Sequence, residues 1–251
     1  MTGNVEEVEE ILRNNPNLDV NWSDENENRS TALDIACDRG HDSIVSILLT
    51  HPGIDVNLKE NGGWTPFNSA CINGSTSCVR LLLKDCRVMV NEPTYDGSTP
   101  LYGACFMGHH DIIRWWITSE REMDLGEPGQ WQSDTIGVAK KYGKTEVVAL
   151  LERFKENPER TRYQVRLELG LADEVAAEIF AMVVFVSDGL LQVTQRNQST
   201  TAAAKFFSIV SRLPLELQIM LCYRLVGSSK EIIHGKDSEM AFKELAKRIL
   251  N

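Results

Sequence analysis

The residues best suited to chemistry lie in the range Gly97–Ile117, which reads GSTPLYGACFMGHHDIIRWWI. This stretch brings together a cysteine, two histidines and an aspartate, which are Cys105, His109, His110 and Asp111. Side chains of these types bind zinc, and a thiol next to an imidazole can also act as a nucleophile beside its base. The stretch alone leaves two interpretations open, a metal or catalytic site and a structural scaffold.

The overall charge narrows the classes of partner. The 251 residues carry a formal net charge of −10, with acidic clusters at Glu6–Glu10 and Asp24–Asn28 and no block of lysine and arginine. A surface that binds nucleic acid needs basic residues to face the phosphates, and an anionic membrane surface needs the same. We therefore expect neither nucleic acid nor membrane among the partners of this protein.

The sequence also bears on the cellular compartment. Met1 is followed by polar and acidic residues, without the basic start and apolar core of a signal peptide. The most apolar segment, Ile179–Val186, is far too short to span a bilayer. An intracellular protein is expected, in the cytoplasm with the nucleus as the alternative. Its six cysteines, none in a CxxC pair, are then expected to stay reduced.

An internal repeat organises the first part of the chain. Three segments align at an interval of 34 residues: STALDIACDRGHDSIVSILL, WTPFNSACINGSTSCVRLLL and STPLYGACFMGHHDIIRWWI. The aligned positions are Thr31, Thr65 and Thr99, then Ala36, Ala70 and Ala104, then Cys37, Cys71 and Cys105, then Gly40, Gly74 and Gly108. A fourth copy with Ala139 and Gly143 follows one residue late. A period of this length is typical of a solenoid.

Each unit predicts a pair of helices. The threonine caps a first short helix, and Pro66 or Pro100 fits its first turn, where no amide donor is lost. The glycine ends that helix where a positive φ is wanted. A second helix follows with two apolar pairs, which in the third unit are Ile112-Ile113 and Trp115-Trp116, both expected in the core. The Asn- and Gly-rich segments after it predict a projecting turn.

These Thr-Pro-Leu-x-x-Ala, Gly-His and Val-Asn elements together resemble the ankyrin repeat, over about four and a half repeats in residues 3–157. The resemblance implies an all-α solenoid of stacked helix pairs with short β-hairpin fingers and a concave groove. It also implies a protein-binding scaffold and not an enzyme. Glu7 and Glu10 stand where inner units are apolar, so they give the first helix the wettable face that a terminal repeat needs.

The repeat also decides between the two interpretations of the chemical stretch. His109 aligns with His41, but the same position holds Ser75 and Lys144 in the other units, which an essential ligand site would not tolerate. Cys105 is one of three aligned cysteines, each in a different layer. We therefore expect scaffold here, with no catalytic residue, no metal and no cofactor.

A second domain is expected after the repeats. The period stops after Glu156–Arg160, so the sequence divides into an array at 1–157 and a C-terminal domain at 158–251. Apolar periodicity, glycines and prolines predict five helices there, over about 158–169, 172–186, 202–212, 214–226 and 238–250. We expect this domain to cap the exposed end of the array.

One segment of the C-terminal domain suggests an alternative function. The range Arg212–Leu225 resembles the opening of an F-box, with Leu213, Pro214, Glu216 and Leu217 matching its pattern. The following VGSSKEII lacks the Asp-Leu of that pattern. A substrate adaptor of a ubiquitin ligase is therefore the alternative to a simple interaction scaffold, and a proline-started amphipathic helix is the plain structural interpretation.

The binding surface follows from the family resemblance. Partners of ankyrin repeats contact finger tips and the exposed face of each first helix. The matching positions hold Trp64, Ile72, Asn73, Tyr95, Ser98, Phe106, Met107, Trp131, Lys141 and Tyr142, while the first full unit offers Asp38 and Arg39. Large apolar side chains there indicate either a stripe that binds an unknown protein partner or extra packing between repeats. We expect the protein to be a monomer.

Overall fold

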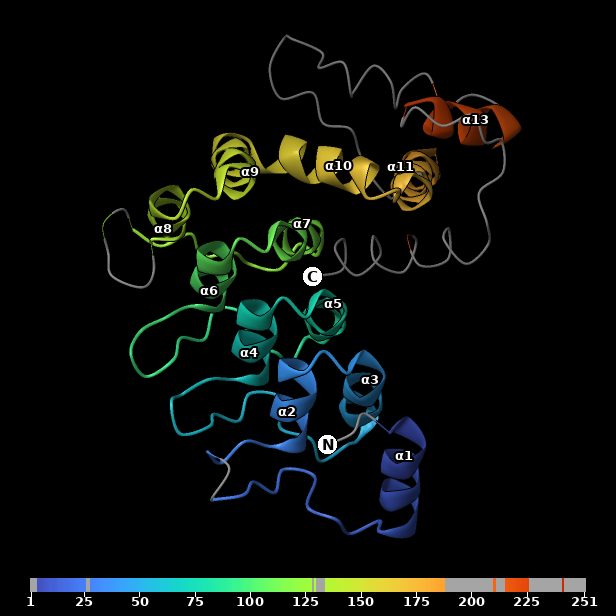
Figure 1. Ribbon diagram of the computed structural model, residues 1–251. Coiled ribbons are helices and arrows are strands. Elements are labelled where there is room, and N and C mark those ends of the chain that lie inside the picture. The colour runs from blue at the N-terminus through green and yellow to red at the C-terminus, as the bar shows by residue number, and fades with distance from the viewer. Residues whose placement is uncertain are drawn as a thin grey trace. The chain divides into compact units, whose positions relative to one another are not determined.

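The computed structural model describes residues 4–25, 28–127, 129, 134–187, 210, 215–225 and 241. Contacts divide the chain into two units, Met1–Arg162 and Tyr163–Asn251, whereas the sequence predicts a boundary between residues 157 and 158. The first unit holds α1 (Val5–Asn14), α2 (Ala32–Asp38), α3 (Asp42–Thr50), α4 (Pro66–Asn73), α5 (Thr76–Lys84), α6 (Pro100–Met107), α7 (His110–Thr118), α8 (Thr135–Lys141) and α9 (Thr145–Glu156) (Figure 1).

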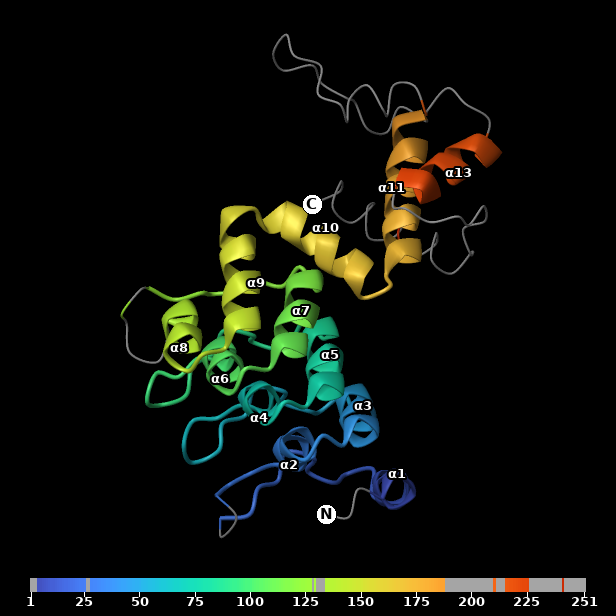
Figure 2. The ribbon, with the colours of Figure 1, turned by 45° about the horizontal axis from the view of Figure 1, so that its top comes forward.

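The helices of the first unit form two rows. The first row is α2, α4, α6 and α8, each packed against the next, and the second row contains α1, α3, α5, α7 and α9. Both views show the loops that precede α4 and α6 projecting from the first row, on the side away from the second (Figures 1 and 2). The expected stack of helix pairs is confirmed.

The first helix of each inner repeat begins as its sequence predicts. Thr31, Thr65 and Thr99 are the N-cap residues of α2, α4 and α6. Each threonine Oγ1 accepts a hydrogen bond of 3.2 Å from the backbone N–H three residues later. The cap satisfies an amide that has no partner inside the helix, which fixes where the helix starts.

The glycine after α4 lies where two neighbouring layers meet. Gly74 has a φ of 76°, and a Cβ placed on it would lie 2.7 Å from Cε1 of His109. The His109 ring reaches back across this contact, and its Nε2 lies 2.9 Å from the carbonyl oxygen of Ile72. This histidine is therefore part of the scaffold, as the aligned positions predict, because its ring links two repeats.

The fingers before α4 and α6 are tight hairpin turns, each closed by a backbone hydrogen bond. In the finger before α4, the Glu60 N–H donates to the Trp64 carbonyl, and in the finger before α6 the Thr94 N–H donates to the Ser98 carbonyl. Both bonds are 3.0 Å long. Adjacent fingers are joined by a bond of 3.2 Å from Tyr95 N–H to the Gly62 carbonyl. Among the described residues only an isolated bridge, between Ser23 and Thr31, has β geometry.

The core of the array corrects one expectation about the tryptophans. Trp116 is fully buried and meets Phe67 edge to face, with ring centroids 5.0 Å apart. Trp115 is only half-buried, and the guanidinium of Arg80 lies 3.8 Å from the centroid of its ring. The prediction that both tryptophans are core is wrong for Trp115. The buried face of this part of α7 runs through Trp116 and Ile117, so Trp115 lies at the edge of the core.

The second unit is built around α11 (Ala172–Ser187) and α13 (Leu215–Leu225), with the later part of α10 (Pro158–Glu168). Its buried cluster contains Val175, Ala176, Ile179, Phe180, Val183, Val210, Cys222 and Tyr223. These helices were expected, whereas those expected over 202–212 and 238–250 lie almost wholly outside the described residues. No helix in the described part of the chain is long and apolar enough to cross a membrane.

Candidate functional site

The structure places the expected binding positions at the ends of α4, α6 and α8 and on the fingers before α4 and α6. The exposed members are Asn73, Tyr95, Met107, Lys141 and Tyr142, and the half-buried members are Trp64, Ile72, Ser98 and Phe106. Trp131 lies outside the residues that the structure describes. The aromatic members therefore differ in how much of each ring reaches solvent.

Tyr95 and Phe106 combine packing with exposure. The Tyr95 ring lies against Gly63 of the preceding finger, where an added Cβ would come within 2.6 Å of the ring, yet the residue is 71% exposed. Phe106 meets Tyr142 of the next repeat edge to face, with centroids 4.6 Å apart, and Tyr142 is 48% exposed. Each of these contacts steadies an aromatic ring while its other side remains open to solvent.

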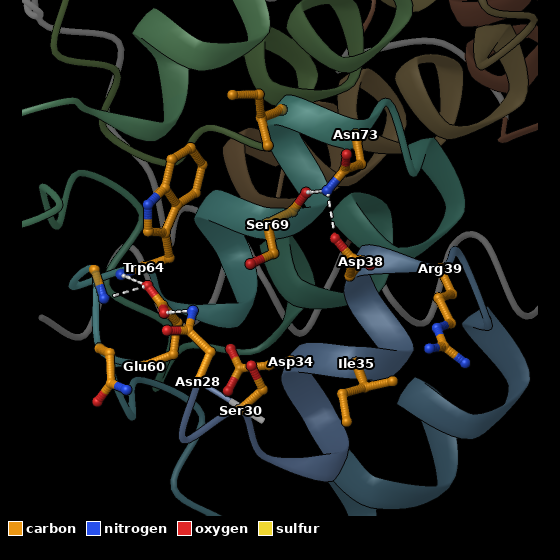
Figure 3. A pocket seen from close by; sticks show the side chains of 13 residues that line it. Asn28, Ser30, Asp34, Ile35, Asp38, Arg39, Glu60, Trp64, Ser69 and Asn73 are labelled. Carbon is orange, nitrogen blue, oxygen red and sulfur yellow. Dashed lines mark hydrogen bonds between the residues drawn. The ribbon is translucent and has the colours of Figure 1, made fainter. Parts of the chain in front are cut away.

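Among the expected positions, Trp64, Ile72 and Asn73 line one pocket of about 890 Å³, together with Asp38 and Arg39 of the first full unit (Figure 3). We call it the acidic pocket, because Asp34, Asp38 and Glu60 also line it. It is bounded by α2, by α4 and by the finger that precedes α4. The structure therefore joins the expected stripe to a group of carboxylates that come from two successive repeats.

Asp34 is the most unusual of these carboxylates. It is 3% exposed, and its Oδ2 accepts hydrogen bonds from the N–H and the hydroxyl of Thr31, at 3.0 and 2.8 Å. Its Oδ1 has no hydrogen-bond partner. Burial raises the pKa of Asp34 to about 6, and the nearby charges of Glu60 and Asp38 push in the same direction against the bonds from Thr31.

Glu60 and Asp38 are held in place by backbone and amide donors. Glu60 is 6% exposed, and its Oε1 accepts bonds from the N–H groups of Gly62 at 2.8 Å and Trp64 at 3.1 Å. The Asn28 amide donates to its Oε2. Asp38 accepts a bond of 2.8 Å from the Asn73 amide (Figure 3). These bonds fix the position of each carboxylate at the wall of the pocket.

Sequence reasoning found Asp38 but missed Asp34 and Glu60. The repeat alignment does carry a signal, because position 34 holds a carboxylate where the next two units have Asn68 and Tyr102. In the structure Asp34 is 3% exposed, and charged residues are seldom buried to this degree. Glu60 gives no comparable signal, since its burial depends on how the finger folds against the neighbouring repeat.

The residues of the chemical stretch do not assemble a reactive centre. Cys105 is buried, and burial raises the pKa of its thiol, which keeps it protonated and unreactive at neutral pH. In the described part of the chain, no group of three or more His, Cys, Asp or Glu residues could hold a metal ion. The contacts that the structure shows for this stretch are packing contacts and hydrogen bonds, such as those of Trp116 and His109.

Comparison with known families agrees with this architecture. Residues 11–68 match the family model "Ankyrin repeats (many copies)", and residues 52–127 match "Ankyrin repeats (3 copies)". No curated protein matches the chain. Ankyrin repeats are generally protein–protein interaction modules and are typically non-enzymatic. Neither match reaches the C-terminal unit. The N-terminal part of this chain is an array of ankyrin repeats.

Proposed function

We propose that the array is an interaction module that binds a protein partner through the fingers and the exposed ends of α2, α4, α6 and α8. The observation that carries this proposal is the exposure of large side chains in the same register of successive repeats. Met107 and Tyr142 each stand directly before a helix-ending glycine and are 45% and 48% exposed. Tyr95 is a third large exposed side chain, on the finger before α6.

The packing of these side chains supports binding. An aromatic ring that is already held on one side loses little conformational freedom when a partner covers its other side. Tyr95 against Gly63 and Tyr142 against Phe106 are both held in this way. The two interpretations of the stripe are thus compatible, since the contacts between repeats preorganise the surface that a partner would cover.

Affinity capture with matched variants tests the proposal. The immobilised full chain is exposed to an extract of the cells that express it, and captured proteins are compared for wild type, Tyr95→Ala, Met107→Ala and Ile11→Ala. Ile11 is 44% exposed but lies on α1, in the other row of helices, so it controls for the loss of an exposed apolar side chain. We expect Tyr95→Ala and Met107→Ala to lose a partner that wild type and Ile11→Ala retain, with unchanged melting temperatures. Equal capture by all four chains would contradict the proposal.

The adaptor alternative rests on α13. This helix keeps Leu217 and Leu225 42% and 52% exposed, which leaves apolar side chains open to a second protein, while Cys222 and Tyr223 are buried in the core of the unit. The Leu213-Pro214 pair of the F-box pattern lies outside the described residues. A pull-down with a Skp1-type adaptor tests this function, and a complex that Leu217→Ala abolishes would support it. No association would exclude it.

A further inference from the structure

Resting on the proposed function, we propose that the acidic pocket receives a lysine or arginine side chain from a basic segment of the protein partner. Three carboxylates line the pocket, those of Asp34, Asp38 and Glu60, against one basic residue, Arg39. Figure 3 shows Arg39 toward the opposite end of the pocket from Asn28 and Glu60. The excess of negative charge agrees with the net charge of the chain, −10, and favours a cationic group over an anionic or neutral one.

The unpartnered oxygen of Asp34 points to a ligand. Buried polar atoms almost always have a hydrogen-bond partner, and leaving one without a partner destabilises the folded protein. Asp34 Oδ1 has none, although the residue is 3% exposed and lines the pocket. The ammonium of a lysine or the guanidinium of an arginine would supply both the missing donor and the opposite charge.

The next repeat shows that the fold does not need this charge. Asn68 stands at the position that aligns with Asp34, and its Oδ1 accepts from the N–H and the hydroxyl of Thr65, at 3.1 and 2.6 Å. The same cap therefore forms with a neutral amide. A buried carboxylate at Asp34 adds nothing to the helix start that an asparagine would not, so its charge serves another purpose.

The remaining walls suit the stem of a long basic side chain. Trp64 is half-buried beside Glu60, where part of its indole can lie along a cation or its methylene groups. Ile35 and Ile72 supply apolar surface on α2 and α4. Lysine and arginine bury such stems against apolar surface while their charged ends reach polar partners. The pocket thus offers carboxylates for the charged end and apolar surface for the stem.

A titration of the full chain with single amino-acid amides tests the pocket directly. The probes are N-acetyl-arginine amide and N-acetyl-lysine amide, with N-acetyl-citrulline amide as the neutral analogue of arginine. Heteronuclear NMR follows the indole N–H of Trp64 and the side-chain amides of Asn28 and Asn73. We expect saturable shifts with at least one cationic probe and none with citrulline. An absence of saturable shifts with both cations, or equal shifts with citrulline, would overturn the proposal.

Two variants separate binding from folding. Asp34→Asn keeps the cap, by analogy with Asn68, and should weaken the cationic probe at least about tenfold, because the charge and the free acceptor are lost. Asp42→Asn makes the same chemical change in the first turn of α3, away from the pocket lining, and should bind like wild type. An Asp34→Asn chain that is folded and binds the probe as wild type does would contradict the assignment.

The capture assay distinguishes failure of this inference from failure of the proposed function. The inference predicts that Asp34→Asn loses the partner that Tyr95→Ala and Met107→Ala also lose. Suppose that capture depends on Tyr95 and Met107 but not on Asp34. This result would support the interaction module and overturn the proposal that the acidic pocket receives a basic side chain of the partner. Capture that none of these variants alters would overturn both, even if the free amides bind.

Discussion

Replacing Asp34 by asparagine should stabilise the array at neutral pH, and the size of the effect can be worked out from the structure. Burial raises the pKa of this carboxyl from 3.8 to about 6 in the folded protein. The folded state then holds the proton more tightly than the unfolded state. The free energy of unfolding therefore falls as the pH rises from about 3.8 to about 6, and this loss persists at every higher pH.

The pKa shift of Asp34 sets an upper limit on how much Asp34→Asn can raise the free energy of unfolding. A difference of 6 − 3.8, about 2 pKa units, corresponds to about 3 kcal/mol of lost stability when Asp34 is ionised. An asparagine cannot ionise, and its oxygen can accept the two bonds from Thr31 as Asn68 does from Thr65. Its new amide group needs an acceptor in the pocket, so we expect a gain of about 1–3 kcal/mol above pH 7.

Urea unfolding of the full chain at a series of pH values measures this difference. The gap between Asp34→Asn and wild type should be largest above about pH 7 and shrink steadily as the pH falls toward 4. Asp42→Asn lies outside the pocket and serves as the matched control, for which no gain in stability above pH 7 is expected. An Asp34→Asn chain that is less stable than wild type above pH 7, or a gap that does not change with pH, would refute the reasoning.

Three other predictions test the packing of the array and the expected cap at its C-terminal end. With the protein native, a thiol reagent should label only Cys86 quickly, because it is the one exposed cysteine of six; fast labelling of a second thiol would contradict the described burial. Gly74→Ala should lower the melting temperature more than Gly143→Ala. Both glycines have positive φ, but only at Gly74 would the new Cβ strike the ring of His109, and equal losses would argue against that contact. Removal of 163–251 should lower the melting temperature and solubility of the array if the C-terminal unit caps it, and an unchanged array would exclude the cap.

The parts of the fold that sequence predicts well are those that local chemistry determines. The starts of α2, α4 and α6 follow from a threonine that caps the nearest free amide, and their ends from a glycine in the left-handed region. Recurrence at a fixed interval reinforces each of these signals. The structural role of His109 could also be predicted from the sequence, because the same position carries different residue types in other repeats.

The acidic pocket could not be predicted in the same way. Glu60 is buried because its finger folds back onto its own carboxylate, and the pocket needs α2 and that finger, from neighbouring repeats, to meet. Nothing in the local sequence around either element reports this contact. Trp115 shows a related limit, since an apolar pair on a helix does not reveal which of its two members faces the core.

Hydrogen exchange of the full chain, measured free and with the captured partner bound, tests the central claim most directly. The account predicts that the partner slows exchange in the finger segments 59–64 and 94–98 and at the ends of α4 and α6, with little change in α3, α5 and α7. Protection confined to α3, α5 and α7 would contradict it, because those helices form the other row of the array.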